Sequence, residues 1–255
     1  MDGEIIALLL LAAAAAGWID AVVGGGGLLM LPALLVAFPT TPVATVFGTN
    51  KLTAIFGTCS AAITYARGVK FDPQVVWPTA GLALAGAGSG AALAGAVSSH
   101  ALRPIVMVVL LTVAALVVLR PAMGAVAEPR LRTPRRLVVA VLVAGLGVGF
   151  YDGLIGPGTG TFLIIALTSI IGLDFVAASA SAKIVNTATN FGALIVFTLN
   201  DNVMWLLGLG LAVCNIAGAQ VGAHMALKRG TGFVRGVLLV VVVALVVKLG
   251  FDQFG

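Results

Sequence analysis

The feature that most constrains this chain is an internal repeat of charged residues within apolar sequence. Asp20 precedes a run of four glycines, and Asp152 precedes a second glycine-rich stretch. The two aspartates are 132 positions apart, and the same offset separates Lys51 from Lys183. Charged side chains inside a membrane-spanning segment are costly and usually have a function there. A duplicated half with interrupted hydrophobic segments at matching positions is typical of transporters, and the interruptions mark the binding site.

The composition is that of a membrane protein. Hydrophobic residues make up 60% of the chain and charged residues 9%, whereas soluble domains carry about 25% charged residues. A helix crosses a bilayer with about 20 apolar residues, and the apolar stretches that approach this length are residues 4–23, 43–66, 73–97, 101–119, 137–151, 175–199, 203–227 and 233–249. Two shorter stretches, 28–38 and 160–171, follow the glycine runs. The sequence predicts an all-α polytopic membrane protein with roughly eight long transmembrane helices and two short or re-entrant ones.

The whole chain, 1–255, is expected to form a single transmembrane domain. The first repeat covers about 1–123, a linker about 120–136, and the second repeat about 133–255. The linker carries Arg120, Arg130, Arg132, Arg135 and Arg136 against one acidic residue, and the positive-inside rule places such a loop in the cytoplasm. We therefore expect a multi-pass protein of the inner (plasma) membrane with this linker on the cytoplasmic side. The N-terminal stretch lacks the positive charge of a signal peptide and is expected to be a mature helix.

Charge placement also predicts how the two repeats are oriented. The polar link at residues 200–202 is acidic, so it should lie opposite the basic linker. A single long helix, residues 175–199, then connects the two sides, and the segments before it must return to the side where they began, as a hairpin. The same reasoning applied to the first repeat gives two repeats of inverted topology. This arrangement puts Arg103 on the outer side, which is the weak point of the assignment, and it leaves open whether the short segments 28–38 and 160–171 span the membrane fully.

The glycine runs are expected to break helices at membrane depth. Non-helical backbone at that depth occurs only where it is buried in protein or lines a cavity. A helix that restarts after such a break directs free amides and the positive end of its dipole into the gap, which suits an anion. Gly25, Gly26, Gly158 and Thr159 are therefore candidate substrate-binding residues. The alternative is that each run is only a tight turn between helices.

The two intramembrane lysines are the main candidates for neutralising a bound anion. A lysine at the centre of a transmembrane helix costs about 2.5–3.5 kcal/mol, so a compensating partner is expected. The accompanying polar side chains differ between the copies: they are Thr49 and Asn50 before Lys51, and Asn186, Thr187 and Asn190 after Lys183. Positions three, four and seven residues on from Lys183 share one helix face with it. The alternative is that each lysine reaches an interface or pairs with an aspartate for structure alone.

Asp20 and Asp152 allow more than one role. They could pair with the lysines, accept backbone hydrogen bonds within the hairpins, or bind a coupling proton, and the sequence does not decide among these roles. No nucleotide motif is visible, and Cys59 and Cys214 lack the spacing of a metal site. We therefore expect no cofactor and no metal.

At these residues the chain resembles the sulfite exporter TauE/SafE family of membrane proteins. The matching segments are residues 17–27, 49–51, 149–160 and 181–183, and the likeness covers essentially the whole chain. The resemblance implies a bacterial or archaeal inner-membrane carrier for sulfur oxyanions such as sulfite, sulfoacetate or related organosulfonates. It does not identify which of these anions is carried.

The expected function is therefore secondary transport of a small anion by alternating access, with export as the expected direction, and not an enzymatic activity. The expected partners are the anion and membrane lipid, with no nucleic acid, and a homodimer is left open. An alternative is a cation transporter or channel that uses Asp20 and Asp152. A third reading, an intramembrane aspartyl protease, is suggested by the dipeptide formed by Tyr151 and Asp152, but the second motif of such enzymes, Gly-x-Gly-Asp, is missing.

Overall fold

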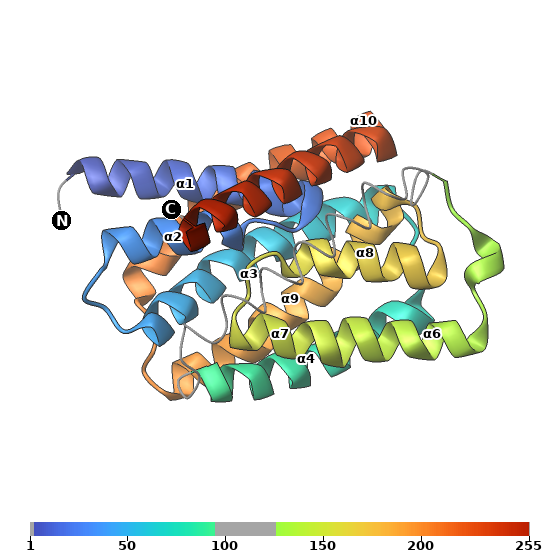
Figure 1. Cartoon of the computed structure of the whole chain (residues 1–255), viewed down its shortest axis with the longest axis horizontal. Coiled ribbons are helices and arrows are strands. Elements are labelled where there is room, and N and C mark those ends of the chain that lie inside the picture. Colours follow the sequence, from blue (N-terminus) through green and yellow to red (C-terminus); the bar gives the residue numbers. More distant parts are fainter. Residues whose placement is uncertain (1–2, 95–125, 255) are drawn as a thin grey trace.

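The computed structural model describes residues 3–94 and 126–254, and all of the regular structure in these ranges is helical. The helices form an elongated bundle (Figure 1). The helix expected at residues 101–119, together with Arg103, lies outside the described residues. The prediction of an all-α polytopic membrane protein is confirmed.

The order of elements follows the repeat. The first repeat contains α1 (Gly3–Val23), α2 (Gly27–Ala37), α3 (Val43–Gly68) and α4 (Pro73–Ala94). The second contains α6 (Pro134–Ala140), a π-helical segment η2 (Val141–Gly147), α7 (Val148–Leu154), α8 (Thr159–Ile171), α9 (Phe175–Leu199) and α10 (Trp205–Phe254). A short 3₁₀ turn, η1 (Pro129–Leu131), precedes α6. The first residues of α2, α3 and α4 are each 132 positions before those of α8, α9 and α10, so the helix starts obey the same offset as the charged residues.

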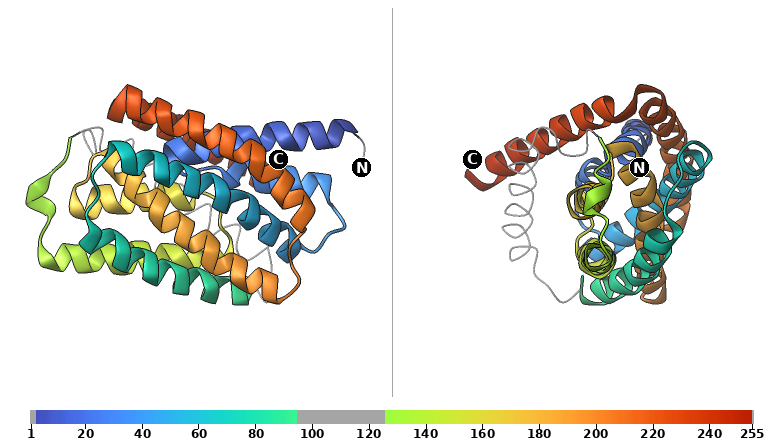
Figure 2. Two further views of the ribbon diagram at one scale, coloured as in Figure 1. Left: turned by 180° about the vertical axis from the view of Figure 1, so that it is seen from behind. Right: turned by 90° about the vertical axis from the view of Figure 1, so that its right-hand side faces the viewer.

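The repeats have opposite directions in the bundle. In Figure 1, α1 runs from the N-terminus at the left towards the right, whereas its counterpart, the rod formed by α6, η2 and α7, runs from right to left. The pairs α2 and α8, and α3 and α9, are likewise opposed. α10 turns back at Gly230, whose φ of 72° joins two helices, and the part after this turn diverges from the bundle in the end-on view of Figure 2. The two repeats are therefore inverted relative to each other.

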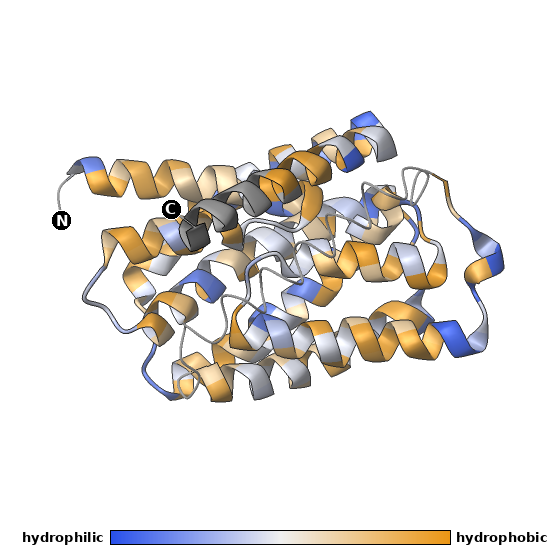
Figure 3. Ribbon diagram, in the orientation of Figure 1, coloured by the Kyte–Doolittle hydropathy of each residue, from blue (hydrophilic) through white to orange (hydrophobic). Residues whose placement is uncertain are grey.

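The basic connections gather at one end of the bundle. Arg132 pairs with Asp72 of the α3–α4 loop, the amide of Glu128 donates to the carbonyl of Gly172, and Gly68 lies against the side chain of Leu227 at the end of the first part of α10. The acidic link at residues 200–202 lies at the other end, against the start of α3. Figure 3 shows hydrophilic residues at both ends and a smaller group in the middle, between apolar helices.

The short helices reach only to the middle of the bundle. At about 1.5 Å per residue, the 11 residues of α2 and the 13 of α8 give about 16 and 20 Å, less than the ~30 Å hydrocarbon core. They enter from opposite ends, and the glycine breaks that begin them touch: a Cβ on Gly24 would lie 2.2 Å from the Cα of Gly160. The two hairpins are thus re-entrant, and they meet tip to tip.

Glycine spacing explains how the repeats interlock. α10 packs on α1, where a Cβ on Gly218 would lie 1.8 Å from the carbonyl oxygen of Ala14. α4 packs in the same way on η2 and α7, where a Cβ on Gly90 would lie 2.1 Å from the carbonyl oxygen of Phe150. Small residues at such crossings let helix backbones approach closely in a membrane. The fourth helix of each repeat therefore packs on the first helix of the other.

Large apolar side chains cover the outside of this bundle, with Leu206 90% and Val36 82% exposed. Such a surface is suited to lipid rather than to water. Among the described residues, the helical segments that are long and apolar enough to cross a membrane are Gly3–Val23, Pro134–Leu154, Phe175–Leu199 and Trp205–Val241. The chain is a multi-pass membrane protein.

Candidate functional site

Two ion pairs lie in the middle of the bundle, and each joins one repeat to the other. Nζ of Lys51, on α3, lies 2.7 Å from Oδ2 of Asp152, on α7. Nζ of Lys183, on α9, lies 3.1 Å from Oδ2 of Asp20, on α1. Each lysine pairs with the aspartate of the other repeat because the inverted repeats interlock. The helix that carries the lysine of one repeat passes the hairpin tip of the other. The two pairs flank the contact between the hairpins.

These charges are deeply buried. The side chain of Lys183 has no exposed surface, those of Lys51 and Asp152 are 4% and 2% exposed, and that of Asp20 is 14% exposed. Deep burial leaves little solvent screening, so removing one partner of such a pair typically destabilises a protein by about 3–5 kcal/mol. Two cations face two anions, so the group as a whole carries no net charge.

The second glycine break is shaped around Asp152. The hydroxyl of Thr159 donates to Oδ1 of Asp152 at 2.5 Å and lies 2.7 Å from the carbonyl oxygen of Gly156. Gly156 has a φ of 91°, and a Cβ there would lie 3.1 Å from Nζ of Lys51. Thr159 is the first residue of α8, and Gly158 before it has a φ of 80°. The break thus positions the carboxylate and leaves room for the lysine beside it.

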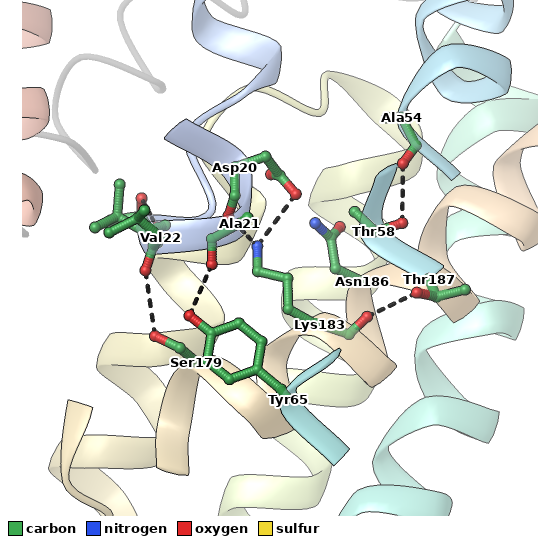
Figure 4. Close-up of polar contacts among 12 residues, drawn as sticks. Asp20, Ala21, Val22, Ala54, Thr58, Tyr65, Ser179, Lys183, Asn186 and Thr187 are labelled. Carbon is green, nitrogen blue, oxygen red and sulfur yellow. Dashed lines mark hydrogen bonds and ion pairs between the residues drawn. The ribbon is translucent and has the colours of Figure 1, made fainter. Parts of the chain in front are cut away.

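The first glycine break is capped by side chains. The last carbonyls of a helix have no partner within the helix, and at membrane depth each unsatisfied group costs several kcal/mol. At the end of α1, four consecutive carbonyls accept side-chain hydrogen bonds from three other helices, and Figure 4 shows the first three of these bonds. The pairs are Asp20 with Lys183, Ala21 with Tyr65 (3.0 Å), Val22 with Ser179 (3.4 Å) and Val23 with Thr161 (2.8 Å).

The sequence analysis did not identify Tyr65, Ser179 and Thr161. The signal that could have found them is the repeat itself, since these hydroxyl-bearing residues match Phe197, Phe47 and Leu29 in the other copy.

Asn50 lies beside the second break. Its side chain is buried, with 5% of the residue exposed, and its Nδ2 lies 3.9 Å from the position that a Cβ on Gly27 would take. The same position lies 3.6 Å from the Cα of Pro157 and 3.8 Å from the carbonyl oxygen of Gly156. Asn50, the start of α2 and the second break therefore converge next to Lys51.

The other predicted glycines lie at the hairpin tips. A Cβ on Gly26 would lie 2.7 Å from Cβ of Asp20, and one on Gly25 would lie 3.2 Å from the side chain of Ile19. Gly26 thus packs against the charged end of α1, whereas Gly25 is surrounded by apolar side chains.

The three polar residues predicted after Lys183 do not share one environment. Asn186 points towards Asp20 and Lys183 (Figure 4), and its Oδ1 accepts a hydrogen bond from Thr189. Asn190 is buried. Thr187, in contrast, donates to the carbonyl of Lys183 at 2.8 Å and lines an apolar groove with Ile184 and residues of α3 and α4. A threonine hydroxyl readily bonds the carbonyl four residues earlier, so Thr187 is turned away from the ion pairs.

Thr49 also lies apart from the ion pairs. Its hydroxyl donates to the carbonyl of Thr45 at 2.7 Å and accepts from the amide of Met204 at 2.9 Å. It is fully buried and ties α3 to the link before α10. For Thr49 and Thr187 the helix position was anticipated, but the side-chain direction differs from that expected of a ligand.

Comparison with known proteins agrees with this architecture. The family model "Sulfite exporter TauE/SafE" matches residues 9–249. The probable membrane transporter protein ORF9 of Sinorhizobium sp. is 36% identical over 222 residues, covering 87% of this chain and 83% of the relative. The probable membrane transporter protein YfcA of Escherichia coli K12 is 34% identical over 227 residues, covering 88% and 82%. No solved structure matches significantly. The chain belongs to the sulfite exporter TauE/SafE family of membrane transporters.

Proposed function

We propose that this membrane transporter carries small sulfur-containing anions, such as sulfite, sulfoacetate or other organosulfonates, by alternating access. The observation that carries the proposal is the pair of buried Asp–Lys contacts, each bridging the two inverted repeats beside a helix break. The family's name supports sulfite-like substrates. The buried lysines supply the positive charge that an anion needs at membrane depth.

The neutrality of the four charges sets a condition on binding. An anion that approaches a lysine competes with the aspartate already paired to it. If Asp152 takes up a proton as the anion arrives, Lys51 becomes free to pair with the anion, and the site stays neutral throughout. An aspartate would then serve in proton coupling as well as in pairing, because one proton and one monoanion cross together.

Alternating access follows from the placement of the ion pairs. Since Lys51 with Asp152, and Lys183 with Asp20, each join one repeat to the other, rocking one repeat changes the contacts between them. Inverted-repeat transporters expose a central site to each side in turn by such rigid-body motion. By the positive-inside rule we place the basic end of the bundle in the cytoplasm, and the inner (plasma) membrane is the proposed location.

A cation transporter is the alternative, since Asp20 and Asp152 face the middle of the bundle. Cation sites need several oxygens with net negative charge. Each aspartate here is paired with a lysine, and among residues 3–94 and 126–254 no three His, Cys, Asp or Glu side chains form a cluster suited to a metal ion. Because each aspartate is already paired with a lysine, neither is free to serve as a cation ligand, and we favour the anion.

Flux measurements in proteoliposomes test the proposal. Purified protein should move radiolabelled sulfite or sulfoacetate down its gradient, faster when an inward proton gradient accompanies an inward anion gradient. Lys51→Ala should reduce the rate to that of empty liposomes while the protein stays folded and inserted. Anion flux that is unchanged in Lys51→Ala, or cation flux that depends on Asp152 and not on Lys51, would exclude an anion carrier.

A further inference from the structure

The two ion pairs are related by the repeat, yet they are not equivalent. Nζ of Lys183 donates both to the carboxylate and to the main-chain carbonyl of Asp20, and the lysine is completely buried. Nζ of Lys51 contacts the carboxylate of Asp152 alone among the described residues. Lys183 therefore binds the backbone of α1 as well as the carboxylate of Asp20, whereas Lys51 binds only the carboxylate of Asp152.

The same difference extends along the backbone of each break. The carbonyls of Ala21, Val22 and Val23 each accept a hydrogen bond from a side chain of α3, α9 or α8. At the matching end of α7, no side chain in the described ranges donates to the carbonyls of residues 153–155. The residues that would do so by symmetry are Phe197, Phe47 and Leu29, which have no donor. The carbonyls of Gly156 and Pro157 accept from Thr159 and Tyr151, which belong to the same hairpin, so these caps do not tie the break to another helix as those of the first break do.

The second hairpin is also irregular before its break. α7 has only seven residues, and the π-helical segment η2 comes immediately before it. π-helical turns are rare and occur frequently at functional sites. In the first repeat, α1 is continuous over its 21 residues. Residues 154–157 of the second break are partly exposed, whereas residues 21–26 of the first break are buried. The second break is thus less enclosed than the first, although α8, the helix that follows it, is itself largely buried.

Beside Lys51 lies a donor without a partner. The side chain of Asn50 is buried and makes no hydrogen bond to any described residue, although its Nδ2 faces the start of α2. With 5% of the residue exposed, this amide has an unused hydrogen bond to offer a ligand that enters beside Lys51. An anion on Lys51 would accept it, and the start of α2 at Gly27 lies on the same side.

We infer that the two ion pairs have different roles in transport. Lys51, with Asn50, binds the anion in place of the Asp152 carboxylate, whereas Lys183 and Asp20 stay paired and fix the first hairpin. The backbone of the second break, residues 154–157, is then the part that adjusts when the anion binds. The inference rests on the proposed function for the identity of the anion, and on the hydrogen bonds of the first break for the fixed half.

Two double variants test the division while leaving the net charge of the protein unchanged. Lys51→Gln with Asp152→Asn neutralises one pair, and Asp20→Asn with Lys183→Gln neutralises the other. We measure the thermal unfolding temperature in detergent, with and without sulfite or sulfoacetate. The first double variant should lose the anion-induced rise in unfolding temperature, and the second should keep it with an anion affinity within about tenfold of wild type. Asn50→Leu should weaken the anion response as well.

The reverse pattern, in which only the Asp20 and Lys183 variant loses the anion response, would overturn the inference. Equal losses in both double variants would overturn it too. If the second double variant does not fold, Tyr65→Phe removes one cap of the first break, and it should lower the unfolding temperature while keeping the anion response. Loss of that response in a folded Tyr65→Phe protein counts against the inference.

A measurement without ligand separates this inference from the proposed function. In hydrogen exchange of the wild-type protein, amides at residues 153–158 should exchange faster than those at residues 21–26. Equal protection would refute the fixed first hairpin. If wild type responds to neither anion, the proposed function and the anion site at Lys51 both fail, while the exchange rates still decide whether the first hairpin is fixed.

Discussion

Lys51 of the first repeat and Asp152 of the second form a buried ion pair, with Nζ 2.7 Å from Oδ2. The pair lies where the inverted repeats meet, so it couples the position of one repeat to that of the other. Its counterpart, Lys183 with Asp20, does the same on the other side of the hairpin tips. The charged residues thus join the two repeats, and they are also the residues that we propose for the transport site.

Removing one partner of an ion pair should destabilise the protein more than neutralising both partners. Asp152→Ala leaves Lys51 buried without a partner, and we expect a loss of about 3–5 kcal/mol in the free energy of unfolding. Combining Asp152→Asn with Lys51→Gln should recover part of this loss, because no uncompensated charge remains. Unfolding in detergent by increasing denaturant measures both values, together with each single variant as a double-mutant cycle. A cycle with no coupling energy would contradict the pairing.

Close helix packing at Gly218 should tolerate no side chain. Gly218→Ala places a Cβ 1.8 Å from the carbonyl oxygen of Ala14, and the forced separation of α10 from α1 should cost about 1–3 kcal/mol. Gly210→Ala is the matched control on α10, because a Cβ there meets nothing within 4 Å. The control should be neutral or slightly stabilising, as expected for Gly to Ala in a helix. Similar losses for both variants would argue against this packing.

The backbone of the second break should require glycine at position 156. Gly156→Ala forces an alanine into a φ of 91° and brings its Cβ to 3.1 Å from Nζ of Lys51. The left-handed conformation alone costs about 1–2 kcal/mol, and displacement of the lysine should reduce anion flux further. Initial uptake rates in proteoliposomes, normalised to inserted protein, measure the effect. Gly81→Ala on α4, where a Cβ meets nothing within 4 Å, is the control and should transport at the wild-type rate.

The two ends of the bundle should be labelled from opposite sides of the membrane. In a protein with Cys59 and Cys214 replaced by serine, Asn200→Cys should react with a membrane-impermeant maleimide added to intact cells. Arg130→Cys should react only after the cells are permeabilised, because the basic end faces the cytoplasm by the positive-inside rule. Labelling of both positions from outside would contradict the inverted arrangement, and labelling of Arg130→Cys alone would reverse the orientation.

The sequence by itself determined the repeat, the helix boundaries that follow it, and the inverted orientation. These properties depend on apolar length and on the distribution of charge, which can be read along the chain. It also identified the four charged residues at the centre, because charges are rare in apolar segments.

Only the tertiary structure decided which aspartate pairs with which lysine and where the remaining side chains point. Pairing within one repeat and pairing between repeats are equally compatible with the offset of 132, and the choice depends on how the inverted helices interlock. The direction of Thr49 and Thr187 depends on which neighbouring carbonyl or amide their hydroxyls reach. The caps from Tyr65, Ser179 and Thr161 depend on where the end of α1 lies among three other helices. Hydrogen bonds between distant segments are short-ranged and directional, so they follow from packing and not from position in the chain.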